Sequence, residues 1–178
     1  MAVELTIPVL QIVGFQNSGK TTLLTKIIEV MNDSGIRVGT VKHHGHGGFP
    51  DSADTDKDTA KHREAGATVT AVEGAGMLQL HAYDVEGWTL SKMLSFYKSL
   101  PLDIILIEGF KREPFPKVVL LRSEEDEVLL EQLENIQAVI SWYKPFKTKI
   151  GSPVFYVGEE SDYMTWVKSY FERKDSIE

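Results

Sequence analysis

One short stretch of the sequence has the residue types and the spacing of a phosphate-binding loop. The segment Gly14-Phe15-Gln16-Asn17-Ser18-Gly19-Lys20-Thr21 fits the pattern G-x-x-x-x-G-K-[ST]. Glycines leave room for backbone N–H groups to turn towards a phosphate, and the following helix directs its positive dipole end at the same anion. The lysine of this pattern reaches the β- and γ-phosphates, and the hydroxyl of Thr21 binds Mg²⁺. The stretch predicts binding of a nucleoside triphosphate; the alternative is a glycine turn before an ordinary helix.

A second stretch places a carboxylate where it could reach the same ligand. The apolar run from Ile104 to Ile107 ends at Glu108, as in a Walker B strand, although aspartate is the usual residue there. In a parallel sheet the carboxyl end of this strand lies beside the phosphate loop, so we expect Glu108 to lie near Mg²⁺ or a water. The alternative is that Glu108 only ends a strand in solvent. Asp103, at the other end of the strand, should face away from the site.

A third stretch is rich in histidine, glycine and aspartate. Lys42 and His43 begin it and could bind an anion, and the other side chains that could bind a ligand are His44, His46, Asp51, Asp54, Asp56 and Asp58. Side chains of these types can also hold a transition metal or Mg²⁺. A solvated loop that binds no metal is the alternative. We expect a role at the nucleotide or substrate site rather than a transition-metal centre.

Composition limits the classes of function. The 178 residues include 19 basic and 26 acidic side chains, for a net charge of −7, which argues against non-specific nucleic-acid binding. No apolar run approaches the roughly 20 residues of a membrane span, and no signal peptide is visible. The chain has no cysteine, so it forms no disulfide and no thiolate metal site. A cytoplasmic protein is expected.

The elements that must position these groups alternate along the chain. We expect strands over 8–13, 36–41, 68–73, 77–83, 102–107, 117–121, 136–140 and 154–157. Between them, apolar spacing predicts helices over 20–34, from a Thr55–Asp58 capping box to Gly66, around 90–97, after Ser123 and over 163–170, with fraying from 173 onwards. Apolar strands alternating with helices predict a single α/β domain over 1–178, with a mostly parallel twisted sheet and helices on both faces.

Four segments together resemble the MobB family of molybdopterin–guanine dinucleotide biosynthesis adapter proteins. They are GFQNSGKTTLL, VKHHGH, DTDKDTAKHREAGA and LIEGFKREPFPKVVL, and the resemblance runs from Pro8 to Leu121. It implies a P-loop NTPase-like fold, GTP and Mg²⁺ as ligands, and a homodimer with at most weak GTPase activity. It further implies an adapter that assists the guanylyltransferase attaching GMP to molybdopterin.

Site residues can be carried over by position. The triphosphate would be held by Gly14, Gln16, Asn17, Ser18, Gly19, Lys20, Thr21 and Thr22. The resemblance implies that residues near the phosphates or the incoming molybdopterin are Lys42, His43, Asp56, Lys57 and Asp58. Glu108 would serve Mg²⁺, together with Thr21, or the attacking water. Glu73 and Gly74 would lie at a strand end facing the nucleotide.

One departure bears on the choice of nucleotide. GTPases commonly read guanine with [NT]-K-x-D after a late strand, whereas Ile140 is followed here by Ser141-Trp142-Tyr143-Lys144. Guanine preference therefore comes from the resemblance alone. Two other enzyme classes stay open: a metallochaperone-type GTPase, attractive for its histidines but weakened by the missing cysteines, and an ATP-dependent small-molecule kinase, for which an arginine-rich lid is missing. A pure interaction module with a vestigial phosphate loop is the last alternative.

Overall fold

The centre of the molecule is a six-stranded sheet in which every pair of neighbouring strands is parallel. The structure is a computed structural model and describes residues 6–43, 45, 58–145 and 150–175. The strands follow the order β2-β5-β1-β6-β7-β8. Their bounds are β1 Val9–Val13, β2 Val38–Lys42, β5 Ile104–Glu108, β6 Lys117–Leu121, β7 Ile136–Ser141 and β8 Val154–Tyr156.

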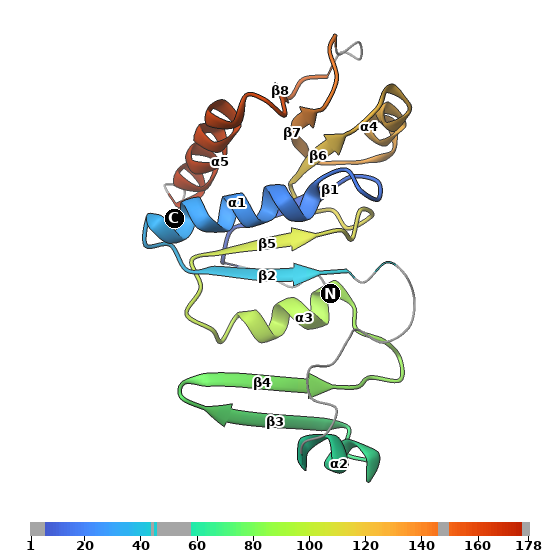
Figure 1. Cartoon of the computed structure of the whole chain (residues 1–178), viewed down its shortest axis with the longest axis vertical. Helices are drawn as coiled ribbons and strands as arrows, with labels where there is room; N and C mark the ends of the chain where they lie inside the picture. Colours follow the sequence, from blue (N-terminus) through green and yellow to red (C-terminus); the bar gives the residue numbers. More distant parts are fainter. Residues whose placement is uncertain (1–5, 44, 46–57, 146–149, 176–178) are drawn as a thin grey trace.

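Helices cover both faces of this sheet, which explains the apolar sequence of its inner strands. On one face, α1 (Lys20–Asp33) and α5 (Glu160–Asp175) pack through Leu24, Ile27 and Val167. On the other, α3 (Leu90–Tyr97) packs through Leu94, and α4 (Val128–Gln132) packs through Leu129. Every residue of β1, β5 and β6 is buried. The expected mostly parallel sheet with helices on both faces is confirmed (Figure 1).

Parallel pairing brings the carboxyl ends of the strands to one edge of the sheet. The Gly14–Thr21 loop leaves that edge after β1, His43 follows β2, and Gly109 follows β5. Further along the same edge, Arg122 follows β6 and Trp142 follows β7. Residues separated by more than a hundred positions in sequence therefore meet at one end of the molecule.

Two predicted strands do not belong to the large sheet. β3 (Val69–Gly74) and β4 (Met77–Ala82) pair only with each other, antiparallel, as a separate hairpin. The connecting residues Ala75 and Gly76 both have positive φ, 51° and 80°, which suits a two-residue hairpin turn. This turn favours local antiparallel pairing over a crossover into the parallel sheet. The hairpin lies beyond α3, next to α2 (Asp58–Glu64), away from the six strands (Figure 1).

Smaller differences from the sequence predictions have local causes. β2 begins at Val38 rather than at residue 36, because Ile36 N–H donates to the Met31 carbonyl at 3.0 Å and so completes the end of α1. The capping box of Ser123 and Asp126 is confirmed, but it opens a 3₁₀ turn before α4. The predicted Thr55 cap of α2 lies outside the described residues, and α5 continues to Asp175. Among the described residues, no helix is long and apolar enough to span a membrane.

Candidate functional site

The Gly14–Thr21 loop has the backbone of an anion-binding turn. Gly14 is buried, and a Cβ at this position would lie 2.8 Å from the Leu120 carbonyl oxygen, closer than two such atoms can approach. Asn17 and Gly19 both take left-handed conformations, with φ of 59° and 95°. Gly19 then begins α1 as its N-cap without a side-chain cap, so the first N–H groups of the helix face the loop. Both glycines of the motif are required by the local geometry.

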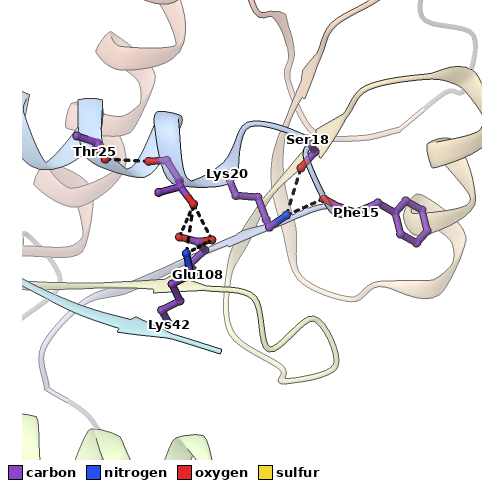
Figure 2. A network of polar contacts seen from close by, with 7 residues as sticks. Phe15, Ser18, Lys20, Thr25, Lys42 and Glu108 are labelled. Atoms are coloured by element: carbon purple, nitrogen blue, oxygen red, sulfur yellow. Dashed lines mark hydrogen bonds and ion pairs between the residues drawn. The ribbon is translucent and has the colours of Figure 1, made fainter. Parts of the chain in front are cut away.

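Lys20 folds back across this loop (Figure 2). Its Nζ donates to the Phe15 carbonyl at 2.6 Å and lies 3.5 Å from Ser18 Oγ. Burial lowers the pKa of Lys20, the Glu108 carboxylate opposes that shift, and the charges of Lys111 and Lys42 add to it. The ammonium group is therefore half-desolvated and bonded to a neutral carbonyl, so a phosphate would be a stronger partner.

Glu108 connects the loop to two neighbouring strands. The Thr21 hydroxyl donates to the Glu108 carboxylate, with Oγ1 2.9 Å from Oε1 and 3.0 Å from Oε2. Lys42 Nζ lies 3.3 Å from the same carboxylate and 3.5 Å from Thr21 Oγ1. Glu108 is 7% exposed, so its charge lies inside the protein and not at a solvated strand end (Figure 2). The position of Asp103 at the opposite end of β5, paired with Arg37, agrees with its predicted orientation away from this site.

The oxygen atoms of Thr21 and Glu108 have the chemistry that Mg²⁺ prefers. Magnesium binds hydroxyl, carboxylate, water and phosphate oxygens, and it usually takes only one or two protein ligands. The ammonium group of Lys42 already lies against both side chains, which shows that a positive charge is accommodated at this point. These residues therefore fit a magnesium ion.

A cleft of about 1400 Å³ opens over these groups at the carboxyl edge of the sheet. Its lining includes Lys20, Lys42, His43 and Glu108. The backbone N–H of His43 donates to the Glu108 carbonyl at 3.0 Å, and its ring lies 4.8 Å from that of Phe110. The structure thus brings Lys42 and His43 to the cleft beside the Gly14–Thr21 loop. Their assignment to the phosphates or to the incoming molybdopterin stays a prediction.

Two residues outside the predicted set, Arg122 and Trp142, hold the Gly14–Thr21 loop from outside. Arg122 Nη1 donates to the Asn17 carbonyl at 2.7 Å, and Trp142 Nε1 donates to the Ser18 carbonyl at 2.9 Å. The guanidinium carbon of Arg122 lies 5.9 Å from the Trp142 ring centroid. Both residues directly follow a parallel strand, β6 or β7, and that placement is the sequence signal by which they could have been found.

Some predicted site residues are not brought to this cleft. Asp58 starts α2, where it pairs with Lys61 at 3.1 Å, and Glu73 and Gly74 lie at the turn of the β3–β4 hairpin. The resemblance implies a strand end facing the nucleotide for Glu73 and Gly74, whereas β3 ends in a hairpin turn away from the six-stranded sheet (Figure 1). The predicted ligand residues that lie outside the described residues are His44, His46, Asp51, Asp54, Asp56 and Lys57. Within the described part of the chain, no group of three or more histidine, cysteine, aspartate or glutamate side chains is arranged to hold a metal ion.

Comparison with known sequences gives one consistent family. Residues 9–142 match the family model described as MobB, molybdopterin guanine dinucleotide synthesis protein B. The chain is 46% identical over 160 residues to a probable molybdopterin-guanine dinucleotide biosynthesis adapter protein of Bacillus subtilis, covering 89% of this chain and 91% of the relative.

Comparison with solved structures agrees. The Bacillus subtilis MobB crystal structure superposes with a TM-score of 0.77 and 43% identity, covering 92% of this chain and 97% of that one. A MobB homologue from Bacillus stearothermophilus superposes with a TM-score of 0.76 and 41% identity, covering 93% and 98% of the two chains. The P-loop NTPase-like α/β fold expected from the sequence is confirmed.

Proposed function

Because the chain belongs to the MobB family of molybdopterin-guanine dinucleotide biosynthesis adapter proteins, we propose that it binds GTP and Mg²⁺ and assists the guanylyltransferase that attaches GMP to molybdopterin. The observation that carries the proposal is the convergence of Lys20, Thr21, Lys42 and Glu108 on one cleft beside a left-handed glycine turn. We also propose a cytoplasmic location, where GTP is available.

The backbone of the Gly14–Thr21 loop and the side chain of Lys20 would bind the triphosphate. The uncapped backbone N–H groups at the start of α1 would face the phosphates, and the helix would add its dipole. Lys20 exchanges the Phe15 carbonyl, 2.6 Å away, for phosphate oxygens. Thr21 and Glu108 would hold Mg²⁺, which supplies charge neutralisation between the phosphates.

We assign the binding of molybdopterin, the second ligand, to Lys42 and His43. Lys42 is 60% exposed at its side chain and lines the cleft together with His43. The cleft volume of about 1400 Å³ exceeds the roughly 300–1,000 Å³ of most small-molecule pockets, so a nucleotide leaves room for a neighbouring group. A pterin carrying a phosphate has the negative charge that these two side chains can bind.

We also propose the homodimer that the resemblance implies, and the β3–β4 hairpin supports it. The cross-strand pairs Ala71–Leu80 and Glu73–Leu78 share one face, and Val69 lies on that face too. Val69, Leu78 and Leu80 are 56%, 64% and 44% exposed in the described part of the chain. An apolar strand face this open is typical of a surface that packs against another chain.

Nucleotide titration of the purified protein tests the proposal. We expect Mg²⁺-dependent binding of GTP in preference to ATP, and Lys20→Ala should weaken it by about 1.5–3 kcal/mol, the worth of a charge-assisted hydrogen bond. Lys20 is only half-buried at the start of α1, so circular dichroism should stay unchanged. Equal GTP affinity in variant and parent would refute nucleotide binding at this loop.

A second assay tests whether the protein assists the guanylyltransferase. Adding the protein to a purified guanylyltransferase with molybdopterin and GTP should raise the yield of the dinucleotide. His43→Ala should reduce that effect while leaving GTP affinity within about threefold, because we assign the exposed His43 side chain to the second ligand and it lies outside the phosphate-loop motif. Yield that is independent of the protein would leave it a nucleotide-binding protein with another partner.

A further inference from the structure

The loop after Glu108 carries a cation that is absent from the expected set of site residues. Lys111 Nζ lies 4.5 Å from the centroid of the Phe15 ring. Phe15 is the second residue of the Gly14–Thr21 loop, and its carbonyl accepts the hydrogen bond from Lys20 at 2.6 Å. Two lysine ammonium groups therefore meet at one residue, Lys20 at its carbonyl and Lys111 at its ring.

The backbone leading to Lys111 is held in a sparsely populated conformation. Gly109 and Phe110 both have positive φ, 86° and 52°, and for a phenylalanine this costs conformational energy. The fully buried side chain of Gln11 donates to the carbonyls of both residues, at 2.7 and 2.6 Å. A buried amide thus fixes the turn that returns the chain from β5 towards the Gly14–Thr21 loop.

The far end of the same loop is anchored as well. Lys117 is 1% exposed, and its Nζ donates to the carbonyls of Glu113 and Glu134 at 2.9 and 2.8 Å. The Glu113 N–H closes the turn by donating to the Phe110 carbonyl at 2.9 Å. With the backbone held at both ends, the long side chain of Lys111 is the part that can move.

The charges of this region favour an anion. Lys111 lowers the pKa of Lys20 more than Lys42 does, so the two ammonium groups repel each other in the absence of a ligand. The cleft lining gathers Lys20, Lys42, Lys111 and Arg112 against only Glu108 and Glu113, in a chain whose net charge is −7. An excess of cations that opposes the overall charge of the chain is typical of an anion site.

We propose that Lys111 is a further phosphate-binding residue. When the nucleotide binds, the Lys111 ammonium group moves away from the Phe15 ring and contacts the terminal phosphate. A cation–π contact at a partly exposed ring is weaker than a charge-assisted hydrogen bond to phosphate, so the exchange is favourable. Lys20 of this motif binds the β- and γ-phosphates, and Lys111 reaches the residue that Lys20 itself contacts. Lys111 therefore distinguishes a triphosphate from a diphosphate. The inference rests on the proposed nucleotide binding.

Calorimetry with GDP and with the non-hydrolysable β,γ-imido analogue of GTP tests this assignment. Lys111→Ala should weaken the triphosphate analogue about tenfold or more and GDP less than about threefold, because only the former has the third phosphate. Lys98→Ala is the matched control, since it removes the same charge from an exposed lysine at the end of α3 that does not line the cleft. It should change both affinities by less than about threefold, as expected for an exposed charge acting at a distance.

Equal losses in Lys111→Ala and Lys98→Ala would overturn the assignment, because they would show a general effect of charge. Equal losses for GDP and the triphosphate analogue would also overturn it. Lys20→Ala separates this failure from that of the proposed function. If Lys20→Ala abolishes binding while Lys111→Ala has no effect, only the role of Lys111 is wrong. If neither variant changes affinity, the nucleotide site itself is wrong.

Discussion

The Thr21 hydroxyl oxygen lies 2.9 Å from Oε1 of Glu108, although 87 residues separate the two in sequence. The contact exists because β1 and β5 are neighbours in the parallel sheet, with Ile12 opposite Glu108 in the register. Thr21 is the second residue of the helix that follows β1, so the hydroxyl and the carboxylate meet above the sheet edge. The two groups proposed to hold Mg²⁺ are thus adjacent in the fold.

Glu108→Gln tests the charge of this pair while keeping its shape. The amide can still accept from Thr21, so GTP affinity without Mg²⁺ should remain within about threefold of the parent. The gain in affinity that Mg²⁺ provides should fall by about tenfold or more, because a neutral oxygen is a weak magnesium ligand. Any hydrolysis should decline in parallel. Titration of GTP at several Mg²⁺ concentrations measures this, and an unchanged Mg²⁺ dependence would reduce Glu108 to a strand terminus.

Trp142 should set the conformation of the Gly14–Thr21 loop. Trp142→Phe keeps an aromatic ring but removes the Nε1 donor that lies 2.9 Å from the Ser18 carbonyl. We expect a loss of about 0.5–1.5 kcal/mol in stability, the net worth of one hydrogen bond, and a decrease in triphosphate affinity of similar size.

The chain offers a matched control for this change. Trp88 Nε1 donates to the Ala82 carbonyl at 3.1 Å, at the end of the hairpin and away from the cleft. Trp88→Phe should therefore cost comparable stability with no change in nucleotide affinity. Urea unfolding and calorimetry on both variants separate the two effects, and identical affinities for the two variants would contradict the role of Trp142.

The ion pair of Arg37 and Asp103 should make stability depend on pH. The hydrogen bond from the Arg37 side chain, aided by one from its backbone N–H, lowers the pKa of Asp103 from 3.8 to about 2. A carboxyl group with a lowered pKa stabilises the fold above its unfolded pKa, and the contribution disappears as pH falls towards the folded value. Asp103→Asn should thus be less stable than the parent at pH 7, and the gap should shrink between about pH 4 and pH 2. Urea midpoints across this range test it; a constant gap would show that the charge is irrelevant.

The sequence predicts the parts of the site that belong to one local pattern. Gly14, Lys20 and Thr21 follow from a contiguous motif, and Glu108 follows from an apolar strand that ends in a carboxylate. The positions of Arg122 and Trp142 after predicted strands place them at the same edge of the sheet, but their contacts with the loop could not be predicted, because these depend on which strands lie beside β1. That order is set by packing over the whole sheet and leaves no fixed spacing in the sequence.

The pairing of β3 and β4 in a separate hairpin is a second feature that strand propensity alone does not predict. β3 and β4 were recognisable as strands from their β-branched and apolar residues, but strand propensity does not say which sheet a strand joins. The two-residue turn at Ala75 and Gly76 makes β3 pair with β4, because its positive φ angles favour a local antiparallel hairpin. Glu73 and Gly74 end β3 at this turn and therefore lie away from the nucleotide cleft.

The exposed face of that hairpin should hold two chains together. Leu80→Glu places a charge in the middle of the face that also carries Val69 and Leu78, and burying this charge without a partner would be costly. We expect the variant to sediment as a monomer at concentrations at which the parent is a dimer. Analytical ultracentrifugation over a range of concentrations measures the shift.

Met77 provides the control for this experiment. It is 72% exposed, and because side chains alternate along a strand it points to the face opposite to that of Leu78. That opposite face also carries Thr70, which is buried and accepts a hydrogen bond from Arg63 of α2 at 3.3 Å, so the chain itself covers part of it. Met77→Glu should therefore leave the dimer intact. If both variants dissociate equally, the effect is one of net charge; if neither does, the dimer forms through another surface and the apolar hairpin face has a different partner.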